Sequence, residues 1–121
     1  TFGIYEKGKF YTIILKDKDE VQRFMPKNFS QQWQMLDTVI LHSFIFTVLF
    51  NTPVPELFFH QSADYLLNEY NKTNSGVIFF LNPVDRKQFM DIAYSGELMP
   101  QKTTYFYPKV PTGLVIHRFA P

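Results

Sequence analysis

Groups that can bind an anion gather in one short segment near the end of the chain, between Met99 and Lys109. A lysine ammonium is a point charge suited to phosphate or carboxylate, and threonine hydroxyls and a glutamine amide add hydrogen-bond donors. The segment therefore predicts a phosphate or other small-molecule anion site, with the candidate residues Gln101, Lys102, Thr103, Thr104, Tyr105 and Lys109. An equally open alternative is an edge strand whose lysines and prolines prevent it from pairing with another chain.

Asn82 is a further candidate, because it lies where an apolar strand is expected to give way to a helix. Free N–H groups at the start of a helix favour anions. The more ordinary role for an asparagine before a proline is a plain helix N-cap. The sequence lacks the glycine-rich loop of a P-loop, so that kind of phosphate site is excluded on pattern.

Residue types that bind metals or carry out catalysis form no pattern in this sequence. There is no cysteine, and His42, His60 and His117 lack the spacing of a zinc site, so no metal site is expected. Asp37 and His42 are about 140° apart around a helix of 3.6 residues per turn, and His42 is expected to be a satisfied core histidine. No catalytic residue can be assigned, because no Ser-His-Asp arrangement follows from this order.

Composition limits the classes of function. The 121 residues are 45% hydrophobic with a net charge of +1, which fits one domain with a single core and argues against nucleic acid as a partner. The longest apolar run, residues 35–50, is shorter than the roughly 20 residues that a bilayer span needs, so no membrane association is expected. The absence of cysteine favours a cytoplasmic protein. Base stacking on Tyr105–Tyr107 is less expected than cross-strand packing.

The elements that must position the candidate residues follow from periodicity and turn signals. A hairpin is expected over residues 2–5 and 9–16, with its second strand covered on both faces because it is almost continuously apolar. Asp17, Ser30 and Ser62 are expected helix N-caps. Helical spacing predicts one long central helix over residues 31–50.

In the second half of the chain, predicted strands alternate with predicted helices. We expect a strand over 56–61, a helix from 62 to about 72, a strand over 77–81, a helix opened by Asn82-Pro83 and closed by Ser95-Gly96, and strands over 103–107 and 114–119. This order predicts an α/β fold, with α+β as the alternative. Residues 1–121 would form a single layered domain with a mixed β-sheet and about four helices.

The first residues suggest a piece of a longer protein. The sequence opens at Thr1 without an initiator methionine, and residues 2–5 already have the composition of a strand. We therefore expect the C-terminal fragment of a longer chain. The missing N-terminal half would then be its first partner and would complete any active site.

The segment from Ser95 to Lys109 closely resembles the closing motif of a family of uncharacterised conserved prokaryotic proteins, filed as domain of unknown function 1015. Three shorter motifs resemble that family in the same order: residues 8–11, Leu36-Asp37 with Leu41-His42, and residues 80–83. The resemblance spans nearly the whole chain and corresponds to the C-terminal part of the family.

The resemblance implies a relationship to the ParB/sulfiredoxin-like fold. The longer family members carry an upstream Asp-Gly-His-His-Arg motif that is absent here, and proteins related by fold include nucleotide-using kinases of free serine. The family has also been linked to chromosome partition. The resemblance thus implies ATP or ADP with Mg²⁺ in the parent protein, a phosphotransferase activity of that parent, and no cofactor or activity of this fragment alone. Supporting residues at a shared cleft would be Asn82, Lys102, Thr103, Thr104 and Lys109.

Three functions are compatible with the sequence. The leading hypothesis is a domain that contributes Lys102 and nearby donors to a nucleotide or small-molecule phosphate site. The second is a structural domain that packs on the N-terminal half or forms a homodimer through its aromatic surface. The third is a nucleic-acid-associated, partition-like protein, against which the near-neutral charge argues.

Overall fold

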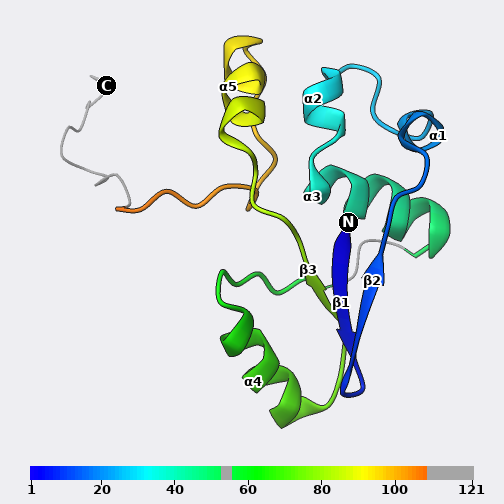
Figure 1. Cartoon of the computed structure of the whole chain (residues 1–121), viewed down its shortest axis with the longest axis vertical. Coiled ribbons are helices and arrows are strands. Elements are labelled where there is room, and N and C mark those ends of the chain that lie inside the picture. Colours follow the sequence, from blue (N-terminus) through cyan, green and yellow to red (C-terminus); the bar gives the residue numbers. More distant parts are fainter. Residues whose placement is uncertain (53–55, 109–121) are drawn as a thin grey trace, which may run out of the picture.

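A three-stranded sheet lies at the centre of the computed structural model, which describes residues 1–52 and 56–108 (Figure 1). β1 (Phe2–Glu6) pairs antiparallel with β2 (Lys9–Ile13) and with β3 (Ile78–Phe80), giving the order β2-β1-β3. Lys7 and Gly8 have φ values of 48° and 76°, as a two-residue type I′ turn requires. The predicted hairpin is therefore confirmed.

The two faces of the sheet differ in how well they are covered. On one face, Phe79 of β3 meets Phe46 edge-on, with ring centres 5.4 Å apart. On the other face, Phe10 of β2 packs against Tyr5 and Phe80 and stays 66% exposed. The prediction that the second strand is covered on both faces was wrong, because β2 lies at the edge of the sheet and four of its five residues are exposed.

The predicted long helix over residues 31–50 is divided into three shorter elements. These are α2 (Gln31–Gln34), α3 (Asp37–Ile40) and η1 (Leu41–Leu49), the last of which is a π-helix. Leu36 interrupts the winding with an extended ψ of 136° and is 1% exposed. The apolar residues of this segment lie on every side of the helix axis, so one straight helix could not turn all of them toward a single core. The break at Leu36 and the wider winding of η1 redistribute them.

The other helices begin at polar caps. Asp17 caps α1 (Lys18–Gln22) and Ser62 caps α4 (Ala63–Thr73), both as predicted. The cap of α5 (Arg86–Tyr94) is Asp85, whose carboxylate accepts from the backbone N–H groups of Lys87 and Gln88. The prediction that Asn82 opens this helix was wrong, because Asp85 is the residue that satisfies its first N–H groups.

The described residues confirm an α/β domain and correct its details. The described strands pair antiparallel, so the expected mixture of parallel and antiparallel pairs is not found among them. Five α-helices and one π-helix occur in this part of the chain, where about four helices were expected. Residues 56–61 and 103–107 were predicted as strands but are irregular. The second of these segments runs from the base of α5 away from the sheet, so it has no strand to pair with (Figure 1). The predicted strand over 114–119 lies outside the described residues.

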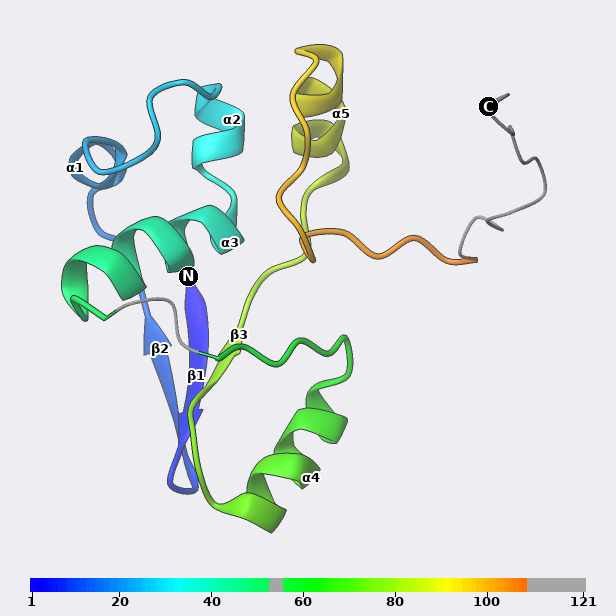
Figure 2. The same ribbon diagram turned by 180° about the vertical axis from the view of Figure 1, so that it is seen from behind.

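The helices gather at opposite ends of the sheet. Figure 2 shows α1, α2, α3, η1 and α5 toward one end, and α4 at the other beside the hairpin turn. The core includes three almost fully buried side chains, Phe2, Leu36 and Ile92, so it joins β1, the α2–α3 junction and α5. Beside the hairpin, the hydroxyl of Tyr70 accepts a hydrogen bond from the backbone N–H of Lys7 at 2.7 Å.

Candidate functional site

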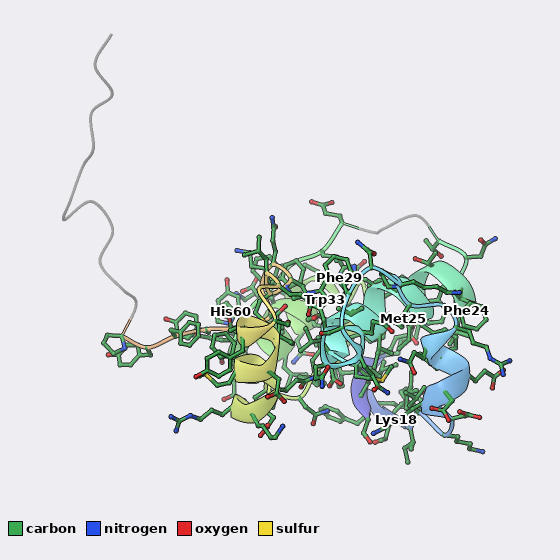
Figure 3. The ribbon with its side chains drawn as sticks, turned by 90° about the horizontal axis from the view of Figure 1, so that it is seen from above. Lys18, Phe24, Met25, Phe29, Trp33 and His60 are labelled. Carbon is green, nitrogen blue, oxygen red and sulfur yellow. The ribbon has the colours of Figure 1, made fainter. Side chains whose placement is uncertain are left out.

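A buried amide fixes the loop that leads into α2. Gln34 is 7% exposed and donates from Nε2 to the carbonyl oxygens of Pro26, at 3.0 Å, and Phe29, at 2.8 Å. Burying this amide without hydrogen-bond partners would cost free energy. The two bonds avoid that cost only when the loop keeps this conformation, so they hold it in place. Phe29 also stacks on Trp33, with ring centres 3.9 Å apart and an interplanar angle of 12° (Figure 3). Trp33 thus has a fixed orientation.

Residues 97–103, here called the strap, follow α5 and are fastened first by a carboxylate. Glu97 accepts from the backbone N–H of Ser30 at 2.5 Å, and its other oxygen accepts from the Ser30 hydroxyl. The Ser95 hydroxyl donates to the same carboxylate at 3.0 Å. These bonds hold the pKa of Glu97 below its usual range, and the bond from the Ser30 hydroxyl has the largest effect. The charged carboxylate therefore joins the end of α5 to the start of α2.

Two further contacts hold the rest of the strap on α2 and α3. Trp33 donates from Nε1 to the carbonyl oxygen of Leu98 at 2.9 Å. The hydroxyl of Thr103 donates to the carbonyl oxygen of Pro100 at 2.7 Å and lies 3.4 Å from the Thr38 hydroxyl. Together with the Glu97 contact, they set the position of the residues between Leu98 and Thr103.

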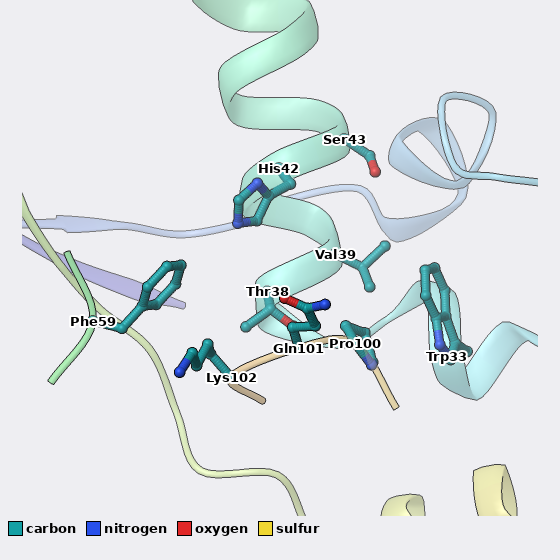
Figure 4. Close-up of a pocket in the computed structure, with 9 residues that line it drawn as sticks. All are labelled: Trp33, Thr38, Val39, His42, Ser43, Phe59, Pro100, Gln101 and Lys102. Atoms are coloured by element: carbon teal, nitrogen blue, oxygen red, sulfur yellow. The ribbon is translucent and has the colours of Figure 1, made fainter. Parts of the chain in front are cut away.

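A pocket of about 340 Å³ lies between the strap and the helices (Figure 4). Its walls come from α2, α3, the start of η1, the segment before α4, and the strap. Its lining residues are Trp33, Thr38, Val39, His42, Ser43, Phe59, Pro100, Gln101 and Lys102. The pocket therefore combines neutral hydrogen-bonding groups and one cation with an apolar wall.

Lys102 brings the positive charge to this pocket in an unusual backbone conformation. Its φ is 62°, a left-handed value that costs a side-chain-bearing residue roughly 1–2 kcal/mol. The conformation turns the strap so that Gln101 and Lys102 both line the pocket, and Figure 4 shows the Lys102 side chain near Phe59. Among the lining residues in the described part of the chain, Lys102 is the one cation, so the candidate site centres on it.

His42 lies on the helical wall of the pocket, in the first turn of η1. Burial lowers the pKa of its imidazole from the ordinary value of 6.5, so the ring is neutral at pH 7 and offers one donor and one acceptor. Its ring meets Phe46 edge-on at 5.5 Å. The prediction of a core histidine was wrong in part, because the side chain is half-buried and lines a pocket.

The residues predicted to form a site are partly brought together. Gln101 and Lys102 line the pocket. Thr103 does not line it, but its hydroxyl contacts that of Thr38 and so joins the strap to α3. Thr104 and Tyr105 are exposed beyond the strap, and Lys109 lies outside the described residues.

Asn82 lies apart from the pocket and has a structural partner. Its backbone N–H and its Nδ2 both donate to Oδ2 of Asp37, at 2.9 and 2.8 Å. Nδ2 also donates to the carbonyl oxygen of Thr1 at 2.8 Å. Asn82 therefore ties the end of β3 to the start of α3.

Sequence reasoning did not single out the helical side of the pocket. Thr38, Val39, His42 and Ser43 line it, and their spacing of one, three and one residues is that of one helix face. That spacing was a usable signal for a shared surface. Nothing in the sequence indicated that Phe59, from an irregular segment, would meet Lys102 from the strap.

The described residues contain no cluster of three or more His, Asp or Glu side chains that could hold a metal ion. Across the same part of the chain, no helix combines the length and the apolar character needed to cross a membrane.

Comparison with protein-family models, with curated proteins and with solved structures finds no match to this chain.

Proposed function

We propose that this domain binds the phosphate group of a small molecule in the pocket beneath the strap. The observation that carries the proposal is the arrangement of Lys102 and Gln101 opposite the helix face of Thr38, His42 and Ser43. A single ammonium with several neutral donors suits an oxyanion, which accepts hydrogen bonds on all its oxygens.

The character of the lining supports an anion over a cation. Of the nine described residues that line the pocket, one is a cation and none is a carboxylate. Trp33 and Val39 exclude part of the surrounding water, which strengthens the attraction between the ammonium and a bound anion.

We extend the proposal to the parent protein through the family that the sequence resembles. ATP or ADP with Mg²⁺ would be the phosphate-bearing ligand there, and this domain would supply a supporting cation to a phosphotransferase such as a free-amino-acid kinase. The absence of cysteine in the 121 residues supports a cytosolic location for it.

A structural role is the second candidate, and exposed apolar side chains favour it. Tyr94, Leu98 and Tyr107 are each more than 80% exposed. Large apolar side chains with this exposure could be covered by another chain. This candidate predicts a dimer in solution, which light scattering measures directly.

The proposal is tested by calorimetric titration of inorganic phosphate and ADP into the wild-type chain and two variants. Lys102→Gln removes the pocket cation, and Lys27→Gln removes an exposed lysine that is not part of the pocket lining. We expect binding that is weakened by Lys102→Gln and unchanged by Lys27→Gln. Equal affinities in all three proteins, or no binding by the wild type, would overturn the proposal.

A further inference from the structure

The pocket is larger than a phosphate group needs, and its unused part is apolar. Its volume is about 340 Å³, whereas one water molecule takes about 30 Å³ of liquid volume, so a phosphate of a few water volumes fills a fraction of it. The remaining lining includes Trp33, Val39, Phe59 and Pro100. A bare anion would leave these side chains in contact with water.

We infer that the ligand of this pocket carries a flat apolar ring joined to its anionic group. The inference rests on the proposed function and names the kind of molecule that the site takes. The anionic end would lie at Lys102 and Gln101, and the ring would lie against one of the two aromatic walls.

Trp33 is preorganised to form one of these walls. Phe29 covers its ring at 3.9 Å, and its Nε1 is held by the carbonyl oxygen of Leu98 at 2.9 Å. A side chain that is already fixed loses little rotational freedom when a ligand arrives. The tryptophan can therefore contact a ring without a further ordering cost.

Phe59 forms the second aromatic wall, and it lies close to the cation. Figure 4 shows its ring beside Lys102 at one side of the pocket, with Trp33 at the other side. Phe59 is 47% exposed, so a ligand ring that covers it removes apolar surface from water. Stacking on an aromatic side chain strengthens the binding of a ring by roughly 5- to 150-fold.

Phe58 provides a matched control from the neighbouring position. It is 68% exposed and does not belong to the pocket lining. Its ring instead lies parallel to His60, within 6°, at a centre-to-centre distance of 6.5 Å. Replacing Phe58 or Phe59 by alanine removes the same side chain from the same irregular segment, but only Phe59 faces the pocket.

The test compares phenyl phosphate with methyl phosphate, which has the same charged group without the ring. For the wild-type chain, we expect phenyl phosphate to bind at least tenfold more tightly by calorimetric or NMR titration. Phe59→Ala should reduce this ratio to about threefold or less while the methyl phosphate affinity stays the same. Phe58→Ala should leave both affinities unchanged.

The outcomes separate this inference from the proposed function. Equal affinities of the wild type for the two esters, or a Phe59→Ala variant that keeps the wild-type ratio, would overturn the ring and leave the phosphate site standing. Phenol binding as tightly as phenyl phosphate, or no binding of either ester, would overturn the phosphate site and the inference that rests on it.

Discussion

The carboxylate of Glu97 accepts hydrogen bonds from both the backbone N–H and the hydroxyl of Ser30, 67 positions earlier in the chain. Ser30 is at the same time the N-cap of α2, because its hydroxyl accepts from the backbone N–H of Trp33 at 3.3 Å. One pair of residues thus caps a helix and anchors the strap that brings Lys102 to the pocket. The stability of the fold and the geometry of the site depend on this pair together.

The Ser30–Glu97 pair predicts a loss of stability in acid. The pKa of Glu97 is lowered from an ordinary 4.5, mainly by the Ser30 hydroxyl, so the unfolded chain binds the proton more readily than the folded chain. The stabilisation is complete above pH 4.5 and is lost as the pH falls through the folded-state pKa. Melting temperatures from pH 7 to pH 3 should show wild type well above Glu97→Gln at neutral pH and equal to it at the acid end.

Glu56→Gln is the control for this comparison, since it removes an exposed carboxylate elsewhere in the chain. It should follow the wild-type curve. A constant difference between wild type and Glu97→Gln over the whole pH range would contradict the assignment.

The Asp37–Asn82 contact predicts that Asn82 stabilises the fold without contributing to ligand binding. Asn82→Ala removes two side-chain hydrogen bonds, to Asp37 and to the Thr1 carbonyl. Unfolding in urea should show a loss of about 1–2 kcal/mol, since each such bond has a usual net value of about 1 kcal/mol. The phosphate affinity should stay at the wild-type value. A variant of normal stability that binds phosphate poorly would restore Asn82 as a ligand residue.

The left-handed backbone at Lys102 predicts opposite effects on stability and binding. Lys102→Gly relieves a strain of roughly 1–2 kcal/mol but adds about 0.5–1 kcal/mol of chain entropy to the unfolded state. The variant should therefore be more stable than wild type by about 0.5 kcal/mol in chemical denaturation, and it should lose phosphate affinity. A less stable glycine variant would show that the Lys102 side chain contributes to folding instead.

The position of His42 predicts that anion binding strengthens as the pH falls below 6.5. Burial lowers its pKa from that value, so the unfolded chain takes up the proton first and the free energy of unfolding decreases as the pH falls. Once the folded protein is protonated, the imidazolium adds a second positive charge to the pocket. Sulfate is the suitable probe, because its charge stays constant over this range.

His42→Gln should abolish the pH dependence of sulfate affinity, and His60→Gln should preserve it because His60 lies outside the pocket lining. An unaltered pH profile in His42→Gln would disprove the role of the imidazole.

Local features of the fold were predictable from the sequence. The hairpin at Lys7-Gly8 and the caps at Asp17, Ser30 and Ser62 depend on a few adjacent residues, and all are confirmed. The break at Leu36 was not predictable, because it depends on the burial of that side chain in the core, which includes elements far along the chain. The segment 103–107 has strand-like composition but meets no partner strand, and composition does not report pairing.

The candidate site divides in the same way. The chemistry of Gln101 and Lys102 was evident from residue type and from the surrounding prolines and threonines. Their partners Thr38, His42 and Phe59 are more than 40 positions away in sequence, and tertiary contacts bring them to one pocket. The cap of α5 shows the limit even for local signals, because Asn82 and Asp85 both suit a helix start and Asp37 engages Asn82.

The most direct test of the phosphate site is a two-dimensional NMR titration of the 121-residue chain with inorganic phosphate, at a fixed pH above 7. We predict that the largest shifts occur at the backbone amides of Thr38, His42, Gln101 and Lys102, and that these shifts shrink strongly in Lys102→Gln. Shifts centred on other residues, or equal shifts in wild type and Lys102→Gln, would contradict the account.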